Sequence, residues 1–294
     1  MKSLGEGDMK HTVFANAADY IDLDQYPLDR SNSPEYAAVL SDATAQLADD
    51  GCCVLKGFVR QDALSRLVDQ ANKVTSLAHR SFNRTNPYFS KDDPDLPATD
   101  PRRRFYDRSN AFVPADNLGP DTGLRAIYEY DPFQAFVKRA LGADRFFRYA
   151  DPLADVILNL VEEGEGFPWH FDTNNFTVTL AIQNGHDGGV FEYAPNLRTA
   201  QDECFSAVAD VLDGTSRQVR SINLVPGDLQ IFKGRYSLHR VTPVTGPKPR
   251  YVGIFSFVET EGMVGSLERT KQLYGRVLPI HHERAGLRSD ILKD

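Results

Sequence analysis

One short stretch of this 294-residue chain carries residue types that hold a catalytic metal ion. In residues 167–173, His170 and Asp172 are separated by one residue within a pattern typical of a β-strand, so both side chains project from the same face. One imidazole and one carboxylate make up two-thirds of the 2-His-1-carboxylate set that binds non-haem Fe(II) and leaves coordination positions open. The pair alone is also compatible with two solvated groups on a surface strand.

A second stretch, residues 227–243, supplies His239 at the start of a predicted strand, and Arg250 opens the next predicted strand. A guanidinium pairs bidentately with a carboxylate, so Arg250 is suited to anchor an anionic cosubstrate. The alternative is a strand-edge arginine in solvent. Arg240 follows His239 directly and should therefore face away from the metal.

The order His170-x-Asp172, His239, Arg250 resembles the signature of the Fe(II)/2-oxoglutarate-dependent oxygenases, over roughly the C-terminal half of the chain. The resemblance implies that His170, Asp172 and His239 bind iron and are the catalytic residues. It implies 2-oxoglutarate as cosubstrate, with its distal carboxylate on Arg250, and O2 as oxidant. Ascorbate is expected to support activity in vitro.

Residues 168–195 and 237–243 are most similar to the stand-alone bacterial oxygenases related to the free-amino-acid hydroxylases and halogenases. This narrower resemblance implies hydroxylation of an unactivated C–H of a small polar metabolite, a free amino acid or derivative, with release of succinate and CO2. In the halogenases of the family a small residue replaces the carboxylate and leaves room for chloride, so Asp172 favours hydroxylation. Desaturation and cyclisation start from the same hydrogen abstraction and stay open.

Further polar residues are candidates to bind the cosubstrate or the substrate. Many family members have a serine where this chain has Val252, so Thr179 and Thr242 are candidates to offer the cosubstrate a hydroxyl instead. Six others are candidates for substrate binding, either because they directly follow the first two metal ligands, where turn chemistry is the alternative, or because they lie in residues 81–120 and suit a carboxylate or amine. They are Thr173, Asn174, Asn175, Arg84, Asn86 and Asp107.

Composition sets the broad class of the protein. Hydrophobic residues make up 41% and charged residues 25%, as in an ordinary globular protein, and the net charge of −8 speaks against a nucleic-acid or anionic-membrane partner. The three cysteines are an odd, sparse set that fits a reducing compartment. Without an apolar signal core or membrane span, we expect a cytoplasmic enzyme with a small-molecule partner, and the sequence leaves its oligomeric state open.

The fold class expected is mainly β with flanking helices. The resemblance implies a double-stranded β-helix, or jelly roll, buttressed by N-terminal helices. Residues 1–19 are expected to be frayed and residues 20–294 to form one oxygenase domain. Within it we expect a helical part in 20–150, a jelly-roll core in 151–260, and a C-terminal helix and tail in 261–294.

Residues 81–120 are rich in Asn, Asp, Pro and Arg, and show little periodicity. Their aromatic residues argue against disorder, so we expect a lid packed over the site. The run Arg102–Arg104 is either a solvated face or a phosphate clamp. The clamp would suit a carrier-tethered or nucleotide-like substrate oxidised by the same iron chemistry. A non-catalytic, cupin-like metal- or ligand-binding protein is the remaining alternative, although it has no need of Arg250.

Overall fold

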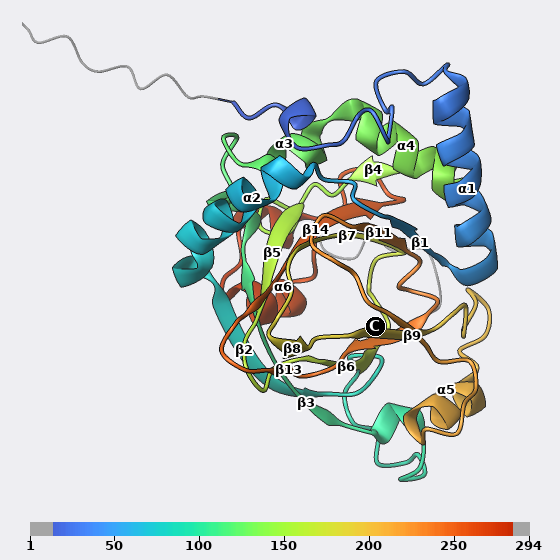
Figure 1. Ribbon diagram of the computed structural model, residues 1–294. Coiled ribbons are helices and arrows are strands. Elements are labelled where there is room, and N and C mark those ends of the chain that lie inside the picture. The colour runs from blue at the N-terminus through green and yellow to red at the C-terminus, as the bar shows by residue number, and fades with distance from the viewer. Residues whose placement is uncertain (1–13, 285–294) are drawn as a thin grey trace, which may run out of the picture.

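The computed structural model describes residues 14–284, so the expectations for residues 1–13 and 285–294 lie outside the described part. Two β-sheets face each other, and helices cover the outer side of the larger one (Figure 1). This arrangement confirms the expected double-stranded β-helix with buttressing helices. The strands are β1 (Cys52–Leu55), β2 (His79–Thr85), β3 (Tyr106–Val113), β4 (Phe147–Arg148), β5 (Val156–Val161), β6 (Phe167–His170), β7 (Phe176–Gln183), β8 (Asp187–Gly188), β9 (Phe191–Ala194), β10 (Arg220–Ile222), β11 (Leu229–Phe232), β12 (Leu238–Val241), β13 (Val244–Thr245) and β14 (Arg250–Val258).

The larger sheet has the strand order β1-β11-β7-β14-β5-β3-β2, with β4 on the end of β14. Its middle strand, β14, pairs antiparallel with both β5 and β7. The smaller sheet has the order β10-β9-β12-β6, and β13 pairs separately with β8. Since β6 and β12 are neighbours in the smaller sheet, the two histidine-bearing segments lie side by side with His170 opposite His239.

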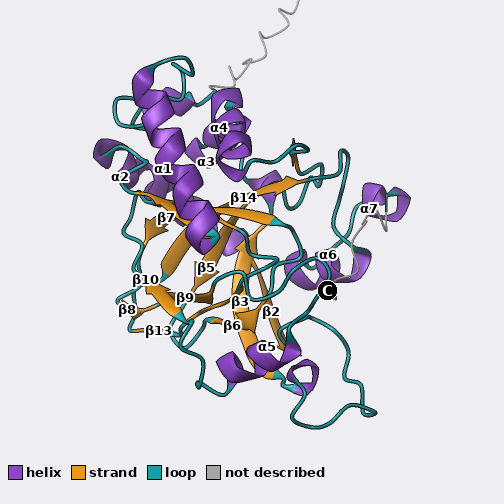
Figure 2. Cartoon of the chain, turned by 90° about the vertical axis from the view of Figure 1, so that its right-hand side faces the viewer, coloured by secondary structure: helices purple, strands orange, loops and turns teal. Residues whose placement is uncertain are grey.

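Helices lie mainly against the outer face of the larger sheet, where the largest hydrophobic core forms between the two layers (Figure 2). That core joins buried aliphatic and aromatic residues of the N-terminal helices to the outward side chains of β5, β7, β11 and β14. The helices are α1 (Pro34–Asp50), α2 (Gln61–Val74), α3 (Gly123–Glu129), α4 (Asp131–Leu141), α5 (Phe205–Leu212), α6 (Leu267–Tyr274) and α7 (Pro279–Glu283), with short 3-10 turns at Ala17–Asp19, Thr75–Leu77, Pro101–Arg103 and Ala115–Asn117.

Local sequence chemistry sets where the first helix begins and ends. The Ser33 hydroxyl accepts a hydrogen bond from the Tyr36 amide at 3.1 Å, and Pro34 occupies the first turn. The helix ends at Gly51, whose φ of 63° is a left-handed conformation that glycine adopts without strain. Pro132 stands in the first turn of α4, where a proline is tolerated, and α3 ends just before it at Glu129.

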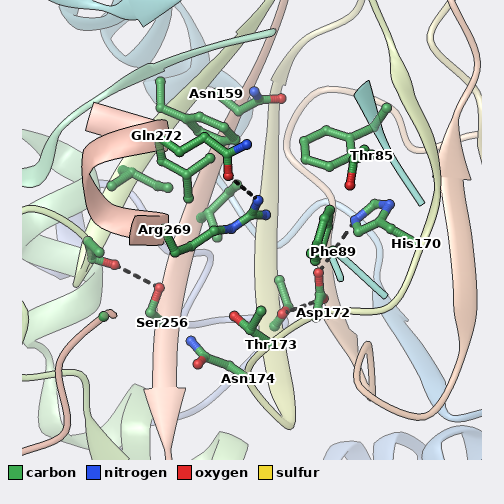
Figure 3. Close-up of a pocket in the computed structure, with 18 of the residues that line it drawn as sticks. Thr85, Phe89, Asn159, His170, Asp172, Thr173, Asn174, Ser256, Arg269 and Gln272 are labelled. Carbon is green, nitrogen blue, oxygen red and sulfur yellow. Dashed lines mark hydrogen bonds and ion pairs between the residues drawn. The ribbon is translucent and has the colours of Figure 1, made fainter. Parts of the chain in front are cut away.

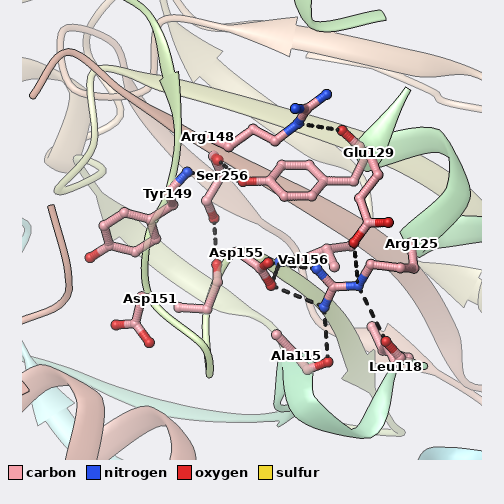
Figure 4. Close-up of polar contacts among 12 residues, drawn as sticks. Ala115, Leu118, Arg125, Glu129, Arg148, Tyr149, Asp151, Asp155, Val156 and Ser256 are labelled. Atoms are coloured by element: carbon pink, nitrogen blue, oxygen red, sulfur yellow. Dashed lines mark hydrogen bonds and ion pairs between the residues drawn. The ribbon is translucent and has the colours of Figure 1, made fainter. Parts of the chain in front are cut away.

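A half-buried ion pair fastens α3 to the strand layer behind the site (Figure 4). Arg125 places Nη1 2.5 Å from Oδ2 of Asp155, and its Nη2 also donates to the Ala115 carbonyl. Nearby, the Tyr128 hydroxyl donates to the Ser256 carbonyl on β14 at 2.7 Å. These bonds hold the helical layer in register with β5 and β14, the strands that carry part of the cavity wall.

Residues 81–120 form the expected irregular segment only in part. Residues 81–85 and 106–113 belong to two regular strands, β2 and β3, which pair along their length and extend the larger sheet beyond β5. Between them, residues 86–105 have one 3-10 turn as their regular element, and Phe89, Ser90 and Lys91 line the cavity described below. Most side chains of β2 and of the first half of β3 are polar, so hydrophobic periodicity does not distinguish these strands from a loop.

The C-terminal helices, α6 and α7, pack near the β2–β3 hairpin and the segment before β5. Helix α6 contacts β2 and β3. In α7, His281 is fully buried, and its Nε2 lies 3.0 Å from Oδ2 of Asp151. Asp151 also accepts hydrogen bonds from the amides of Leu153 and Gly265. His281 is therefore a structural residue that ties α7 to the segment before β5.

Candidate metal centre and substrate cavity

Two imidazoles lie side by side on the last two strands of the smaller sheet, β12 and β6. His170 closes β6 and His239 lies in β12, and their ring centroids are 4.1 Å apart. Nδ1 of His170 lies 2.8 Å from the Pro168 carbonyl, and Nδ1 of His239 lies 2.9 Å from the Ser237 carbonyl. A carbonyl can only accept, so each Nδ1 carries the proton and each Nε2 keeps its lone pair free for a metal.

Asp172 completes the group from the loop that follows β6. Its Oδ1 lies 3.6 Å from Nε2 of His170 and 3.4 Å from Nε2 of His239. The other carboxylate oxygen, Oδ2, accepts a hydrogen bond from the Thr177 hydroxyl at 2.7 Å. Thr177 therefore fixes the carboxylate so that Oδ1 points toward the two imidazoles.

Gly234 leaves the space that this carboxylate occupies. A Cβ atom built on Gly234 would stand 1.9 Å from Oδ2 of Asp172, which is far inside van der Waals contact. The two segments are also joined by a hydrogen bond from the Asp172 amide to the Gly234 carbonyl at 3.1 Å. Only a residue without a side chain fits here while the carboxylate keeps its position.

The electrostatics of the group favour a cation. Burial, together with repulsion from His239, lowers the pKa of His170 to about 3, so this imidazole is neutral at physiological pH. Burial would raise the pKa of Asp172, but the pull of His239 and the hydrogen bonds from both imidazoles hold it well below the usual range. Two imidazoles and one carboxylate are the donors that non-haem Fe(II) takes.

The three candidate ligand atoms fit one metal ion. One donor atom from each of His170, Asp172 and His239 lies within 4.8 Å of the other two. Among residues 14–284 this is the one group of three or more His, Cys, Asp or Glu side chains with such spacing. The three side chains predicted from the sequence are therefore brought together, with donors suited to Fe(II).

Arg250 begins β14 and reaches the same cavity from the larger sheet. It is 9% exposed, and its guanidinium has no carboxylate within ion-pairing distance in the described part of the chain. Burial lowers its pKa to about 10, so it remains charged at neutral pH. A charged, unpaired guanidinium in a cavity wall is suited to bind an anion. That this anion is the distal carboxylate of 2-oxoglutarate stays a prediction.

The cavity has a volume of about 1010 Å³, enough for a cosubstrate and a small substrate together. Thr179 lines it and donates from its hydroxyl to Oε1 of Gln230 at 3.0 Å, and Gln230 in turn donates to Sγ of Cys52 at 3.3 Å. Thr179 is thus placed as predicted, beside a second polar side chain that the sequence did not single out. Thr242 does not line the cavity, and its hydroxyl accepts a hydrogen bond from the Val190 amide.

Three of the six predicted substrate residues line the cavity, namely Thr173, Asn174 and Arg84 (Figure 3). Arg84 is exposed, so it lies at the mouth of the cavity. The Thr173 carbonyl accepts a hydrogen bond from Nη1 of Arg235 at 2.9 Å, which holds the loop after Asp172 in place.

The other three predicted substrate residues lie elsewhere. Asn86 is fully buried and organises its own loop, because its side chain bonds Ser90, the Tyr88 amide and the Arg102 carbonyl. Asp107 is exposed on β3 and pairs with Arg84 across the hairpin. Asn175 donates to Glu259 on the surface. None of these three lines the cavity.

The run Arg102–Arg104 is not a phosphate clamp in this structure. Each arginine pairs with a carboxylate, and none lines the cavity. The pairs are Arg102 with Asp100, Arg103 with Asp92 and Arg104 with Asp213.

Sequence reasoning missed the cations at the far end of the cavity. Arg108 on β3 and Arg269 on α6 both line it, and both stack on the ring of Phe89. Phe89 itself lies 5.6 Å from the His170 ring and has a φ of 55°, which is uncommon for a non-glycine residue. Recognising residues 106–113 as a strand would have placed Arg108 on the face opposite Asp107.

The fold and the site together define a non-haem Fe(II)- and 2-oxoglutarate-dependent oxygenase. Within this class the chain belongs to the Halogenase D family, whose family model matches residues 36–274. No curated protein matches the sequence.

Solved structures confirm the fold at low sequence identity. The non-haem α-ketoglutarate-dependent epimerase SnoN from nogalamycin biosynthesis aligns with a TM-score of 0.52 and 16% identity, over 76% of this chain and 84% of SnoN. AviO1 from Streptomyces viridochromogenes Tue57 aligns with a TM-score of 0.52 and 15% identity, over 75% of this chain and 95% of AviO1. The carbocyclase SnoK from nogalamycin biosynthesis aligns with a TM-score of 0.51 and 12% identity, over 74% of this chain and 83% of SnoK.

One further finding concerns membranes. Among the helices of residues 14–284, none is both long and apolar enough to cross a bilayer.

Proposed function

We propose that this member of the Halogenase D family is a hydroxylase, which oxidises an unactivated C–H bond of a small polar metabolite, an amino acid or a derivative, with release of succinate and CO2. The observation that carries the proposal is the Asp172 carboxylate. It occupies the position that the halogenases keep open for chloride. The Thr177 hydroxyl donates a hydrogen bond to it, and Gly234 leaves the space that it fills.

The chain's own groups have distinct roles in this proposal. His170, Asp172 and His239 would hold Fe(II), which, with 2-oxoglutarate and O2, supplies the oxidising power for hydrogen abstraction. Arg250 would bind the distal carboxylate of 2-oxoglutarate, and Thr179 and Gln230 offer polar contacts beside it. The aromatic rings around His170, including Phe167 and Phe89, would keep water from the reacting centre.

The fate of the substrate hydrogen distinguishes hydroxylation from its alternatives. Desaturation and ring closure begin with the same abstraction and leave products of different mass. A carrier-tethered or nucleotide-like substrate receives no support from Arg102–Arg104, since these side chains are paired outside the cavity.

The test is succinate formation with Fe(II), ascorbate and 2-oxoglutarate across a panel of free L-amino acids and their acidic and phosphorylated derivatives, with product mass recorded. A compound that stimulates succinate release and gains one oxygen supports the proposal. Chloride incorporation, or loss of two hydrogens without oxygen gain, would replace hydroxylation with another outcome. His239→Ala is the matched inactive control.

A further inference from the structure

Two guanidinium groups lie beside the Phe89 ring in the wall of the cavity. Arg269 lies over the Phe89 ring with Cζ 4.0 Å from its centroid, and Arg108 lies 5.6 Å from the same centroid. Figure 3 shows the Phe89 ring between Arg269 and His170. Both arginines line the cavity, and they come from segments far apart in the sequence, β3 and α6.

Arg108 is buried without a counter-charge. It is 2% exposed, and none of its three side-chain nitrogens has a hydrogen-bond partner among the described residues. Its guanidinium lies flat over Phe167, 3.9 Å from the ring centroid. Arg269 donates to Oε1 of Gln272 at 2.9 Å and has no carboxylate partner within residues 14–284.

The strands around Arg108 carry more buried polar atoms that lack a partner. Asn83 faces Arg108 across the hairpin, and Ser81 faces Asn110 in the next position on the same side. The Ser81 hydroxyl, the Asn83 carbonyl oxygen and both side-chain atoms of Asn110 make no hydrogen bond within the described chain. Buried polar groups are almost always hydrogen-bonded. Of these three residues Asn83 alone lines the cavity with Arg108, so its carbonyl oxygen and the Arg108 guanidinium are the unpartnered groups that a polar ligand in the cavity can reach.

The acidic residues of the cavity do not neutralise the pair. Among the lining residues they are Asp151, Asp172 and Glu268. Asp151 is already bonded to His281 and two backbone amides, Asp172 belongs to the candidate metal centre, and Glu268 is exposed.

The charges of the catalytic assembly balance without Arg108 and Arg269. The two positive charges of Fe(II) and the one of Arg250 match the one negative charge of Asp172 and the two of 2-oxoglutarate. The two guanidiniums are then left with two positive charges in a buried region, which is unfavourable unless a ligand supplies the opposite charge.

We propose that Arg108 and Arg269 form the anion subsite of the substrate, and that the substrate presents two negative charges there, as a phosphate monoester or as a pair of carboxylates. The inference rests on the proposed function and narrows its substrate class. A neutral or cationic amino acid would leave the two guanidiniums uncompensated.

Binding is tested on the whole protein without turnover, in the absence of O2, with Mn(II) in place of iron and saturating 2-oxoglutarate. The ligands are matched pairs: O-phospho-L-serine against L-serine, and L-glutamate against L-glutamine, measured by calorimetry. We expect the phosphate or the dicarboxylate to bind at least about tenfold more tightly than its neutral counterpart. The pair that shows the difference identifies which kind of anion the site takes.

The preference should disappear in Arg108→Met and in Arg269→Met while 2-oxoglutarate binding is retained. Equal affinity within both pairs, or a preference that survives both substitutions, would overturn the proposal. If dianions bind through Arg108 and Arg269 but no compound of the panel is oxidised, the proposed function fails while the anion subsite stands.

Stability separates a ligand-binding role from a structural one. Arg198 is the matched control, because its guanidinium also lies 3.9 Å over a phenylalanine ring but is bonded to Glu203 and to the Arg235 carbonyl. Arg198→Met should lower the melting temperature of the ligand-free protein, whereas Arg108→Met should raise it or leave it unchanged. A loss of stability in Arg108→Met as large as in Arg198→Met would show that Arg108 is structural.

Discussion

At the scale of single residues, the neighbours of the Asp172 carboxylate hold it in one position. Thr177 holds one of its oxygens, and Gly234 provides the space for that oxygen. The site is therefore adapted to a carboxylate and not merely tolerant of one.

Gly234→Ala should displace Asp172 and weaken metal binding. Because the new Cβ would overlap Oδ2 of Asp172, we expect a loss of stability of about 1–3 kcal/mol, and a Mn(II) affinity at least about tenfold lower. Urea unfolding and calorimetry measure the two effects. In an Asp172→Gly background the same substitution should cost little stability, since the clash is gone; an unchanged cost would contradict this account.

Arg250→Met should raise the KM for 2-oxoglutarate about 100-fold or more, because a buried charge-assisted pair is lost. Arg240→Met is the control: Arg240 is the neighbouring arginine on β12 but pairs with Glu192. Initial rates of succinate release at varied 2-oxoglutarate measure the effect. A KM within threefold of the wild type, about the scatter of such assays, would assign the anchor elsewhere.

The histidine in β6 should make the metal-free protein sensitive to mild acid. The pKa of His170 is about 3 in the folded protein and about 6.5 when unfolded, so the unfolded chain takes up the proton first. Its contribution to stability is complete above about pH 6.5 and falls toward pH 3, by at most about 1.4 kcal/mol per pH unit. Urea midpoints between pH 6.5 and 4.5 should depend less on pH in His170→Gln than in the wild type or in the exposed control His186→Gln.

At the scale of elements, the β2–β3 hairpin explains why Asp107 was predicted to bind substrate and Arg108 was not. Once the segment is a hairpin, Arg84 pairs with Asp107 on one face and Asn83 faces Arg108 on the other. A segment read as a loop has no faces, so nothing in its sequence favours Arg108 over Asp107. The metal ligands were predictable from their residue types and spacing, but the expected shared strand face is wrong, because β6 ends at His170 and Asp172 reaches the site from the loop that follows.

Strand β1 buries two of the three cysteines against the sheet. Burial raises the pKa of both Cys52 and Cys53 to about 12, while Cys204 is half-buried before α5. One thiol per chain should therefore react with a thiol reagent at pH 8 in the native protein, and three after unfolding in urea. Loss of the fast thiol in Cys204→Ser identifies it; rapid reaction of Cys52 would show that β1 detaches readily.

At the scale of the whole molecule, the architecture and the metal centre followed from the sequence, but the cavity did not. Its wall combines side chains from both sheets, the Phe89 loop and α6, and only folding brings Arg108 next to Arg269. Helices and their caps depend on residues that are close in the sequence, whereas the placement of Arg108 next to Arg269 depends on the path of the entire chain.

The ligands of the site should stabilise the entire fold, because they link the two sheets. Mn(II) together with 2-oxoglutarate, each at about 100 times its Kd, should each add about 2.7 kcal/mol to the free energy of unfolding. Thermal unfolding with and without EDTA measures the gain. His239→Ala should lose the metal-dependent part, and an equal gain in this variant would place the metal elsewhere.

The position of Phe89 has a consequence for where a substrate is oxidised. Its strained backbone holds an aromatic ring between His170 and Arg269, so the separation of the metal centre from this guanidinium is set by the protein. A substrate anchored by its charged end would then be oxidised at a fixed distance from that end. In a series of homologous compounds, the oxidised carbon should stay at a constant number of bonds from the anion, whatever the length of the remaining chain.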